Sequence, residues 1–411
     1  MRRVVITGVG AVSPLGRDVA ALLAGLAAGR SAVRRMAGWE SYIGLRSLVG
    51  APAELADEKR IPRQSRRTMG RMSIFAVQAA EQALADGGVG GGELAGGRTG
   101  CVIGSTMGSA QSISEAFELM LPDRDLSKMP STKFFQCVSH TASMNVAQYL
   151  GITGCVMATS AACASGLQAV GAAYDLIRLG RQDRVLCGGA EELHPTVTGS
   201  FDVLYATSTR YNDTPAKTPR PFDRDRDGLV CGEGSGVLLL EDCEQAVRRG
   251  ARIYAEVVGY ATCGSGSHVS ESDRAAMAAC MRAALDSAGV SAAEVDYVNA
   301  HATATLQGDG EEAQAIREVF GGATPASSLK GYLGHTLGAS GAIELIAALK
   351  MMEGGVVYPT LNLEHVAPDC EGIDHVTGLR RKDMRILVKN SFAFGGINAA
   401  VVCRRVDNNA A

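Results

Sequence analysis

The stretch 159-TSAACASGL-167 leads into a segment whose apolar side chains recur at steps of three and four, at Leu167, Val170, Tyr174 and Ile177. Such steps predict a buried helix, so Cys163 lies where that helix opens. Free N–H groups and the helix macrodipole at this end favour thiolate over thiol, and small neighbours leave room for a substrate. The stretch is typical of a nucleophile, although tight packing around a structural cysteine produces the same pattern.

Outward from this helix, segments with strand patterns alternate with segments with helix patterns. The first half has predicted strands at residues 4–6, 99–104 and 184–188 and predicted helices at residues 20–26, 71–85 and 164–179. The second half has predicted helices at residues 274–288 and 341–352 and predicted strands at residues 297–301, 385–389 and 399–404. This alternation is typical of an α/β fold. The sequence contains no residue-level internal repeat and no long interdomain linker.

Length and composition favour a large globular protein. The chain has 411 residues, of which 46% are hydrophobic and 20% charged, which predicts one large layered unit or two fused domains. No apolar run approaches the roughly 20 residues that cross a bilayer, and Gly8, Gly10 and Pro14 interrupt the apolar N-terminal stretch before a signal peptide develops. We therefore expect a cytoplasmic protein with no membrane partner. The net charge of −3 argues against general nucleic-acid binding.

Two cofactor classes are not expected from the sequence. The 11 cysteines form no Cys-x-x-Cys pair, and the close pair Cys137 and His140 supplies too few ligands for zinc. The Gly8-Val9-Gly10 motif fails as a dinucleotide fingerprint because Ser13 occupies the third glycine position. The cysteines resemble reduced core residues, and we predict neither a metal nor a redox cofactor.

Two further segments carry candidate catalytic side chains. His301 ends a predicted strand, and the hydroxyls of Thr303 and Thr305 should point to one side of an extended chain. A glycine-rich loop that runs into a helix then holds Lys330, His335 and, within the helix, Glu344. Each histidine could also be a satisfied core residue, and Lys330 with Glu344 could form a purely structural ion pair.

A last glycine turn, 390-NSFAFGGIN-398, follows a predicted strand and could direct backbone N–H groups at a developing oxyanion. One cysteine, two histidines and no metal suit acyl or carbon transfer through a thioester. A Cys-His protease is the competing chemistry. It would normally use an Asn or Asp to orient a single histidine, whereas this sequence offers two histidines in similar loops.

Over nearly its full length, the chain resembles the β-ketoacyl-acyl-carrier-protein synthases of types I and II, members of the thiolase-like superfamily. The matching motifs run from 4-VVITGVG-10 through 160-SAAC-163, 188-GGAE-191, 208-STRYND-213 and 220-RPFD-223 to 394-FGG-396. The resemblance implies a five-layered αβαβα fold with two pseudo-duplicated halves, each centred on a mixed sheet. We place these halves at residues 1–250, which carry Cys163, and 251–411, which carry His301, Lys330 and His335.

The resemblance also implies a reaction, a decarboxylative Claisen condensation that yields a β-ketoacyl-acyl carrier protein. Cys163 would take an acyl chain from the 4′-phosphopantetheine arm of an acyl carrier protein, with the N–H groups of Cys163 and Phe394 as oxyanion hole. His301 and His335 would then polarise malonyl-acyl carrier protein and assist its decarboxylation. Lys330 would belong to the catalytic set and Glu344 would support it. The pantetheine arm belongs to the substrate, so no further cofactor is implied.

The remaining positions that the resemblance implies concern the pocket and the partners. Thr303 and Thr305 would contact pantetheine, Phe394 would be a gating aromatic, and Met107 would lie at the floor of the acyl pocket. Arg63, Arg66 and Arg67, with Arg71, have helical spacing and could form a basic face. The resemblance favours docking of the acidic carrier protein over a solvated face. A homodimer is usual in the family, and a heterodimer with a chain-length-factor-like subunit is the alternative.

Two departures from the family pattern affect the substrate. Ala302 replaces the usual glycine after the first histidine, and Ile397 replaces the usual threonine after Gly395-Gly396. Both should reshape the pocket, so fatty-acid elongation and a type II polyketide or aryl-polyene pathway both stay open. The rival functions are a non-catalytic chain-length-factor-like subunit, which would lack the nucleophile, and a CoA-dependent thiolase, which would carry a second cysteine in the last glycine-rich loop.

Overall fold

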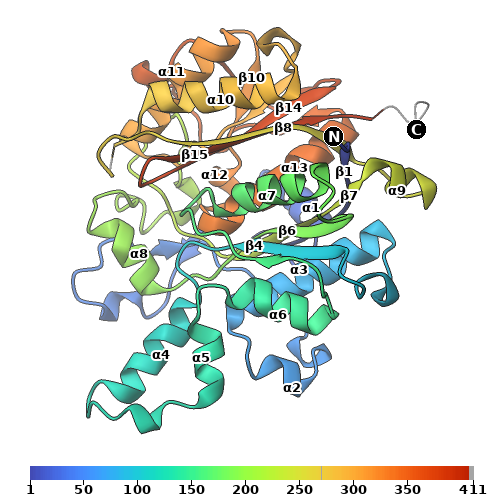
Figure 1. The fold of residues 1–411 in the computed structure, drawn as a ribbon. Helices are drawn as coiled ribbons and strands as arrows, with labels where there is room; N and C mark the ends of the chain where they lie inside the picture. The colour runs from blue at the N-terminus through green and yellow to red at the C-terminus, as the bar shows by residue number, and fades with distance from the viewer. Residues whose placement is uncertain (270, 407–411) are drawn as a thin grey trace.

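The computed structural model describes residues 1–269 and 271–406. Eleven of its strands form one hydrogen-bonded series, in the order β12-β10-β9-β14-β15-β8-β1-β7-β6-β4-β5. Figure 1 shows that this series occupies two layers, joined where β1 (Val4–Val12) pairs antiparallel with the start of β8 (Ala255–Gly264). Two small hairpin-like sheets lie outside the series: β2 (Arg34–Arg35) with β3 (Val49–Gly50), and β11 (Val356–Val357) with β13 (Arg380–Arg381).

The two layers repeat one topology. The first contains, besides β1, the strands β4 (Thr99–Gly104), β5 (Val156–Met157), β6 (Arg184–Glu191) and β7 (Gly234–Asp242). The second contains, besides β8, the strands β9 (Tyr297–Asn299), β10 (Pro325–Ser327), β14 (Ile386–Ala393) and β15 (Ile397–Arg404), and β12 (Asp374–His375) extends its edge. The orders β5-β4-β6-β7-β1 and β10-β9-β14-β15-β8 correspond strand for strand, with the same parallel and antiparallel pairings. The backbone therefore has the duplication that the family resemblance implies.

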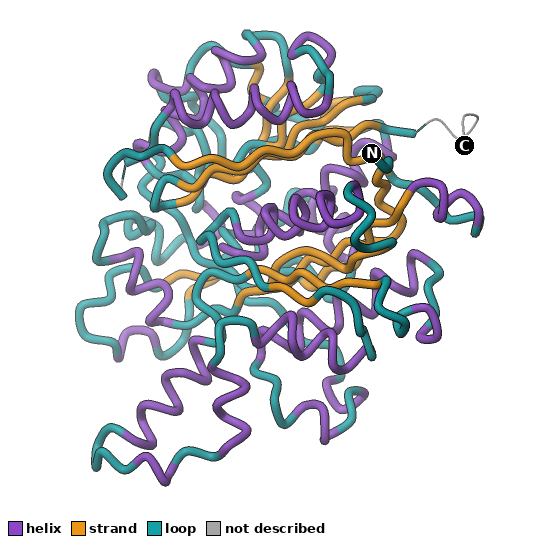
Figure 2. The backbone as a smooth tube through the Cα atoms, viewed as in Figure 1, coloured by secondary structure: helices purple, strands orange, loops and turns teal. Residues whose placement is uncertain are grey.

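Helices fill the space between the sheets and cover both outer faces, as the ribbon in Figure 1 and the tube in Figure 2 show. Between the sheets lie α1 (Val19–Ala27), α7 (Ser165–Arg178) and α13 (Ser340–Gly354); α10 (Arg274–Ala288) and α11 (Leu306–Phe320) cover the second sheet, and α3 (Arg71–Gly87) and α6 (Thr141–Leu150) cover the first. Shorter helices complete the fold: α2 (Arg63–Arg66), α4 (Ala110–Met120), α5 (Ser131–Cys137), α8 (Pro195–Asp202), α9 (Cys243–Arg248) and α12 (Lys330–Leu333). This is the predicted five-layered αβαβα fold.

The patterns in the sequence account for most of these elements. The strand predicted at residues 99–104 and the helix predicted at residues 274–288 have the observed bounds of β4 and α10. The side chain of Asp273 caps the start of α10 by accepting a hydrogen bond from the N–H of Ala276 at 3.0 Å. The side chains of α13 are buried on nearly all sides because two sheets enclose the helix. No helix within residues 1–269 and 271–406 is long and apolar enough to cross a bilayer.

The two central helices occupy equivalent positions in the two halves, and their N-terminal loops meet. A Cβ atom on Gly189 would lie 2.1 Å from the carbonyl oxygen of Gly338, and one on Gly166 would lie 2.5 Å from the same oxygen. Since no side chain fits at either distance, glycine is required for this close approach. The approach brings the loop before α7, which carries Cys163, against the loop before α13, which carries His335.

Candidate active site

Cys163 lies two residues before the start of α7, as the sequence predicts, and is 2% exposed. The preceding residue, Ala162, has φ 47°, in the left-handed region that residues with side chains rarely adopt. The Ser165 hydroxyl braces this turn by accepting a hydrogen bond from the Ala161 N–H at 2.8 Å and donating one to the Ala162 carbonyl at 2.7 Å. The braced turn fixes the direction of the Cys163 thiol.

The side chains of Cys163, His301 and His335 converge at one point. Nε2 of His335 lies 2.9 Å from Sγ of Cys163. The two imidazole rings are nearly perpendicular, at 82°, with centroids 5.2 Å apart. Sγ and one ring nitrogen of each histidine all lie within 4.8 Å of one another. The fold thus brings together the cysteine and both histidines, which are far apart in the sequence.

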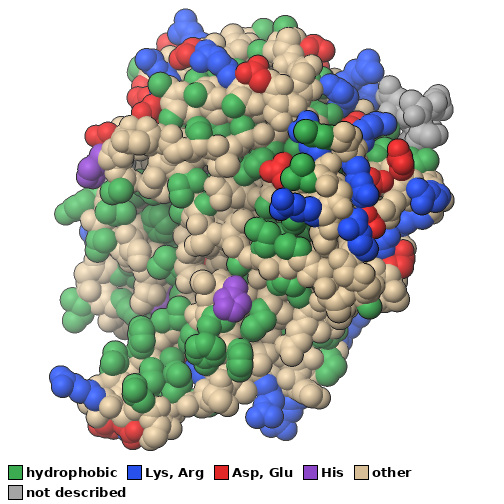
Figure 3. Space-filling view, viewed as in Figure 1, with side chains coloured by type: hydrophobic (Ala, Val, Ile, Leu, Met, Phe, Trp, Pro, Cys, Tyr) green, Lys and Arg blue, Asp and Glu red, His purple; other side chains and the backbone are tan. Residues whose placement is uncertain are grey.

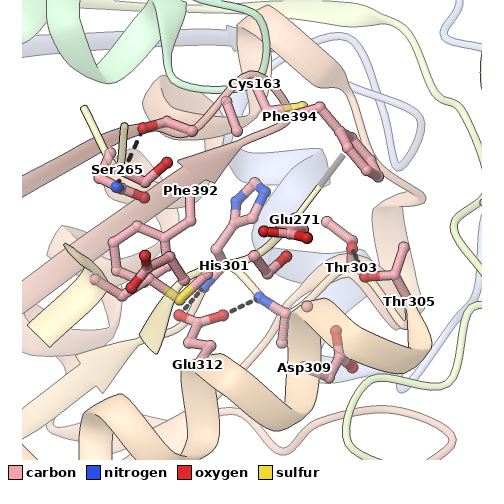
Figure 4. A pocket seen from close by; sticks show the side chains of 18 of the residues that line it. Cys163, Ser265, Glu271, His301, Thr303, Thr305, Asp309, Glu312, Phe392 and Phe394 are labelled. Atoms are coloured by element: carbon pink, nitrogen blue, oxygen red, sulfur yellow. Dashed lines mark hydrogen bonds between the residues drawn. The ribbon is translucent and has the colours of Figure 1, made fainter. Parts of the chain in front are cut away.

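Backbone hydrogen bonds hold both histidines in place. His301 lies two residues after the end of β9. The carboxylate of Glu312 on α11 accepts hydrogen bonds from the N–H groups of His301 at 2.7 Å and Ala302 at 2.6 Å, as Figure 4 shows. The N–H of His335 donates to the carbonyl of Val230 at 2.7 Å. Each ring therefore rests on a fixed segment of backbone.

Buried carboxylates brace other loops around the site, and sequence reasoning missed them. Asp309, one helical turn before Glu312, accepts a hydrogen bond from the Ala304 N–H at 3.0 Å. Glu191 accepts hydrogen bonds from the N–H groups of Thr106 at 2.7 Å and Gly338 at 3.0 Å, so it joins a loop of the first half to the loop before α13. Asp309 and Glu312 stand three residues apart near the start of the helix that follows the His301 loop. This spacing could have identified these two of the three buried carboxylates, but not Glu191.

Behind the histidines, Lys330 and Glu344 form the predicted ion pair. Nζ of Lys330 lies 2.8 Å from Oε1 of Glu344, and both side chains are buried. The structure adds Lys389 on β14, whose Nζ lies 2.5 Å from Oε2 of Glu344. Sequence reasoning missed Lys389 because it stands within a predicted strand, 59 residues after Lys330.

Burial and the two lysines determine the protonation of the site. Burial, reinforced by the charges of Lys330 and Lys389, lowers the pKa of His301 and that of His335 well below 6.5. Both imidazoles are therefore neutral at neutral pH. Nδ1 of each ring has no hydrogen-bond partner among residues 1–269 and 271–406, so the tautomer of each ring is not set from the Nδ1 side.

The helix end alone does not decide the protonation of Cys163 in the resting site. Burial raises the pKa of the Cys163 thiol to about 12, and the charge of Lys330 lowers it only in part. Cys163 thus carries its proton at neutral pH. The ring nitrogen of His335 at 2.9 Å is the base placed to accept that proton.

A pocket leads to Cys163, and several predicted residues line it: His301, Ala302, Thr303, Thr305 and Phe394. Oγ1 of Thr303 lies 3.1 Å from Oγ1 of Thr305, so the two hydroxyls face the same side as predicted. Figure 4 shows the Phe394 ring beside Cys163, on the turn between β14 and β15. The pocket thus combines an apolar wall with paired hydroxyls.

Two residues predicted for the acyl pocket do not line this pocket. Ile397 packs against the core between the sheets, because side chains alternate along β15 and the neighbouring Asn398 faces the pocket instead. Met107 lies in a separate apolar groove with Ile113 and Phe117 of α4. The sequence located both residues near the site but could not give the direction of their side chains.

The predicted basic face contains fewer unpaired arginines than the helical spacing of the four residues indicates. Arg63 and Arg67 are exposed at the two ends of α2, whereas Arg66 donates a hydrogen bond to Glu58 at 3.2 Å. Arg71 does not belong to this face, because it begins α3 and its guanidinium forms an ion pair with Glu233 at 2.7 Å. A break at residues 68–70 separates the two helices, which the residue spacing alone did not reveal.

Cys163, His301 and His335 could in principle supply three ligands to a metal ion. The three residues come from three separate loops, so their spacing in the sequence does not indicate this cluster. The nearby buried charges argue against a divalent cation there: Lys330 and Lys389 lower the pKa of the histidines, and the field that disfavours a proton also disfavours a metal ion. The cluster is better suited to acid–base and nucleophilic chemistry.

Comparison with known proteins agrees with this geometry. The profile of the β-ketoacyl synthase N-terminal domain matches residues 1–246, and that of the C-terminal domain matches residues 254–364. The 3-oxoacyl-[acyl-carrier-protein] synthase 1 of Escherichia coli K12 is 37% identical over 408 residues, covering 99% of this chain and 100% of the relative.

Two solved structures show the same fold. A β-ketoacyl synthase from Burkholderia phymatum superimposes with a TM-score of 0.96 at 45% identity, covering 99% of this chain and 100% of its own. A ketosynthase bound to the hexaketide, in complex with its type II polyketide acyl-carrier protein, superimposes with a TM-score of 0.91 at 32% identity, again over 99% of this chain and 100% of that chain.

Proposed function

This chain belongs to the β-ketoacyl synthase family, and we propose that it uses Cys163 to condense a bound acyl group with malonyl-acyl carrier protein. The observation that carries the assignment is the contact of 2.9 Å between Cys163 Sγ and His335 Nε2, with His301 within 4.8 Å of both. A chain-length-factor-like subunit would lack this nucleophile. A thiolase would add a second cysteine to the pocket, and Cys163 is the one cysteine that lines it in the described part of the chain.

The first half-reaction loads the enzyme. Sγ of Cys163 attacks the thioester carbonyl of an acyl-carrier protein as His335 accepts the thiol proton. The Cys163 sulfur–carbon bond forms, the carbon–sulfur bond to pantetheine breaks, and the leaving sulfur takes the proton from His335. Backbone N–H groups of Cys163 and Phe394 stabilise the oxyanion of the tetrahedral intermediate.

The second half-reaction uses both histidines as hydrogen-bond donors. Malonyl-carrier protein enters, and the bond between its methylene carbon and its carboxylate breaks with release of CO₂. The electron pair forms a thioester enolate, whose oxygen accepts hydrogen bonds from the neutral imidazoles of His301 and His335. The enolate carbon attacks the acyl carbonyl, the bond to Cys163 breaks, and the thiolate recovers one proton from solvent.

The carrier protein supplies the only prosthetic group that this scheme uses, its pantetheine arm. Thr303 and Thr305 are placed to hydrogen-bond that arm, because their paired hydroxyls line the pocket beside Cys163. No resident metal takes part in the scheme.

An assay of both products tests this function. Release of CO₂ from malonyl-carrier protein should match the amount of β-ketoacyl-carrier protein formed, and both should require acyl-carrier protein. A panel of saturated and polyunsaturated acyl groups then selects between fatty-acid and polyketide or aryl-polyene pathways. Release of CO₂ without a condensed product would show that the chain is a decarboxylase and would contradict the proposed condensation.

We propose α2 as the docking surface for the carrier protein. Arg63 and Arg67 present two exposed charges with no acidic hydrogen-bond partner among the described residues, and Arg66 contributes beside them despite its pairing with Glu58. The carrier proteins of this family are acidic, so attraction of opposite charges would guide the encounter.

Reversing the two exposed charges should weaken carrier-protein recognition. The double variant Arg63→Glu/Arg67→Glu is expected to lower kcat/KM for acyl-carrier protein about tenfold at low salt, because the docking face changes sign. The rate with a short acyl-pantetheine, which does not need that face, should stay unchanged. Arg282→Glu on α10, at the opposite end of the molecule in Figure 1, is the matched control. Equal losses with both substrates would contradict docking at α2.

The edge of the first sheet supports a dimer. Val156 and Met157 of β5 are 44% and 41% exposed at the end of the strand series, and Phe134 and Phe135 of α5 are 54% and 41% exposed. Figure 3 shows hydrophobic side chains gathered over the lower part of the molecule, where Figure 1 places α4, α5 and α8. Because an unpaired apolar edge strand is a template for pairing, we propose a second copy of this chain as its partner.

Sedimentation of the purified chain checks the dimer. The wild type is expected to sediment as a dimer, and Val156→Arg as a monomer, because a charged side chain cannot be buried against the paired edge. Val247→Arg, at an exposed apolar position of α9, should leave the dimer intact. A monomeric wild type would favour a different subunit, such as a chain-length factor, as the partner.

A further inference from the structure

Lys389 is a second buried lysine on one buried glutamate. Its Nζ lies 2.5 Å from Oε2 of Glu344, while Nζ of Lys330 lies 2.8 Å from Oε1 and 3.1 Å from Oε2 of the same carboxylate. The side chains of both lysines are 0% exposed and that of Glu344 is 1% exposed. Glu344 is therefore held from two sides in the layer between the sheets.

The charges in this cluster do not cancel. Two lysines share the carboxylate of Glu344, while the next carboxylate, that of Glu312, accepts hydrogen bonds from the N–H groups of His301 and Ala302 instead. One lysine charge is thus left without a carboxylate of its own, and burying such a charge is unfavourable. Lys330 alone would neutralise Glu344. The stability of the fold therefore gives no reason for the second lysine. Its position relative to Cys163 and the two histidines indicates a role in the reaction instead.

That position is directly behind the histidines. Lys389 pairs with Asn299 of the parallel strand β9, two residues before His301. Phe392, three residues further along β14, packs against His301 with ring centroids 6.5 Å apart. The charge of Lys389 reaches both imidazoles and disfavours their protonation, as that of Lys330 does.

We propose that Lys389 is a positioning residue for the condensation, which with Lys330 fixes Glu344 and keeps the two imidazoles neutral so that they can donate hydrogen bonds to the malonyl enolate. This inference rests on the proposed function. Lys389 and Glu344 are surrounded by the following titratable groups: Lys330 on α12, Glu312 on α11, Tyr297 on β9 and the two histidines, His301 and His335.

The same arrangement makes the enzyme sensitive to alkaline pH. Burial lowers the pKa of Lys389 from 10.5 to about 8, although the charge of Glu344 opposes this effect. Lys389 is thus charged below pH 8 and loses its proton as the pH rises through 8. Above that value the positive charge of Lys389 disappears, and with it the electrostatic attraction that this charge adds to the hydrogen bonds of the two neutral imidazoles at the enolate oxygen.

Two variants of Lys389 test the proposal. Lys389→Met removes the charge but keeps the length of the side chain, and Lys389→Arg keeps the charge at all working pH values. The rate of malonyl decarboxylation by the acylated enzyme is measured from pH 5 to 9.5, and acyl loading of Cys163 is measured separately. Lys350→Met, at the surface end of α13, is the matched control.

Lys389→Met is expected to decarboxylate malonyl-carrier protein about tenfold more slowly at pH 7 and to move the acidic limb of the profile upward by about one pH unit, because the histidines are protonated more easily. Lys389→Arg should restore the rate and remove the decline near pH 8. The proposal would be overturned if the pH profile of decarboxylation were unchanged in both variants. It would also be overturned if the rate fell equally at every pH while the acidic and alkaline limbs of the profile kept their positions.

If Lys389→Met does not fold, the alkaline limb of Lys389→Arg decides alone: its persistence near pH 8 overturns the proposal. Failure of the proposed function is a separate result, since it would appear in the wild type as absence of acyl loading or of condensed product. A wild type that condenses, with Lys389 variants that behave identically to it, overturns only the role of Lys389.

Discussion

Cys163→Ala should abolish condensation, with a loss of at least about 10⁴-fold in the rate of β-ketoacyl product formation. The covalent intermediate requires a sulfur atom, and no other cysteine lines the pocket among the described residues. The braced turn at Ala162 and Ser165 has its hydrogen bonds in the backbone and the serine side chain, so the alanine variant should keep its fold. Product is measured by mass spectrometry of the carrier protein.

A second cysteine provides the control for this variant. Cys137, at the end of α5, is half-buried and lies outside the pocket. Cys137→Ala should form product at the wild-type rate. Product formation by Cys163→Ala within tenfold of the wild type would contradict a covalent acyl-cysteine.

The two histidines should separate the half-reactions. His301→Asn and His335→Asn are each expected to slow decarboxylation about 10³-fold, because each removes one imidazole from the enolate oxygen. Acyl loading should be slowed only in His335→Asn, since Nε2 of His335 contacts Sγ and the raised pKa of Cys163 makes a base necessary. Loading is followed by rapid quench and intact mass, and decarboxylation by CO₂ release.

The pH dependence supplies an independent readout for the same histidines. Their pKa values lie well below 6.5, so the neutral form persists as the pH falls from 7 through 6.5. Wild-type decarboxylation should therefore stay level across this range and fall only at lower pH. Equal loading defects in both variants, or an acidic limb at pH 6.5 or above in the wild type, would contradict these roles.

The sequence predicts the layered fold well because its elements have strong periodicity. The α/β alternation appears in the helical spacing of apolar residues along α7 and α10 and in the short apolar segment of β4, which contains Val102 and Ile103. The duplication was not visible in the residues themselves, because the two halves share strand order rather than side chains. It follows from the family resemblance, and the matching orders β5-β4-β6-β7-β1 and β10-β9-β14-β15-β8 confirm it.

The sequence predicted the active-site residues that belong to recognisable motifs. It did not predict the residues that come together only in the folded structure. Cys163 stands in a stretch of small residues before a helix, His301 at the end of a strand and His335 in a glycine-rich loop, and all three were found. Glu191 belongs to the motif 188-GGAE-191, but its contacts with two distant loops are not visible in the sequence. Lys389 was missed because a lysine within a strand has no local signature. Such residues become visible only when the fold brings distant segments together.

Two features that the sequence did not predict have the same kind of physical cause. The helix end at Cys163 favours a thiolate, but the two enclosing sheets remove the thiol from water and raise its pKa to about 12. The sequence also grouped Arg71 with the basic face, whereas the chain turns between α2 and α3 and directs Arg71 to Glu233. Burial and chain direction are tertiary properties, which residue spacing does not contain.

The mass of the intact protein tests the central claim most directly. Wild type and Cys163→Ala are incubated with acyl-carrier proteins and weighed, and malonyl-carrier protein is then added. The wild type should gain one acyl group and lose it when malonyl-carrier protein is added, while the variant stays unmodified. If no acyl group in the panel loads Cys163, or if the variant loads equally, Cys163 is not the nucleophile and the condensing mechanism is wrong.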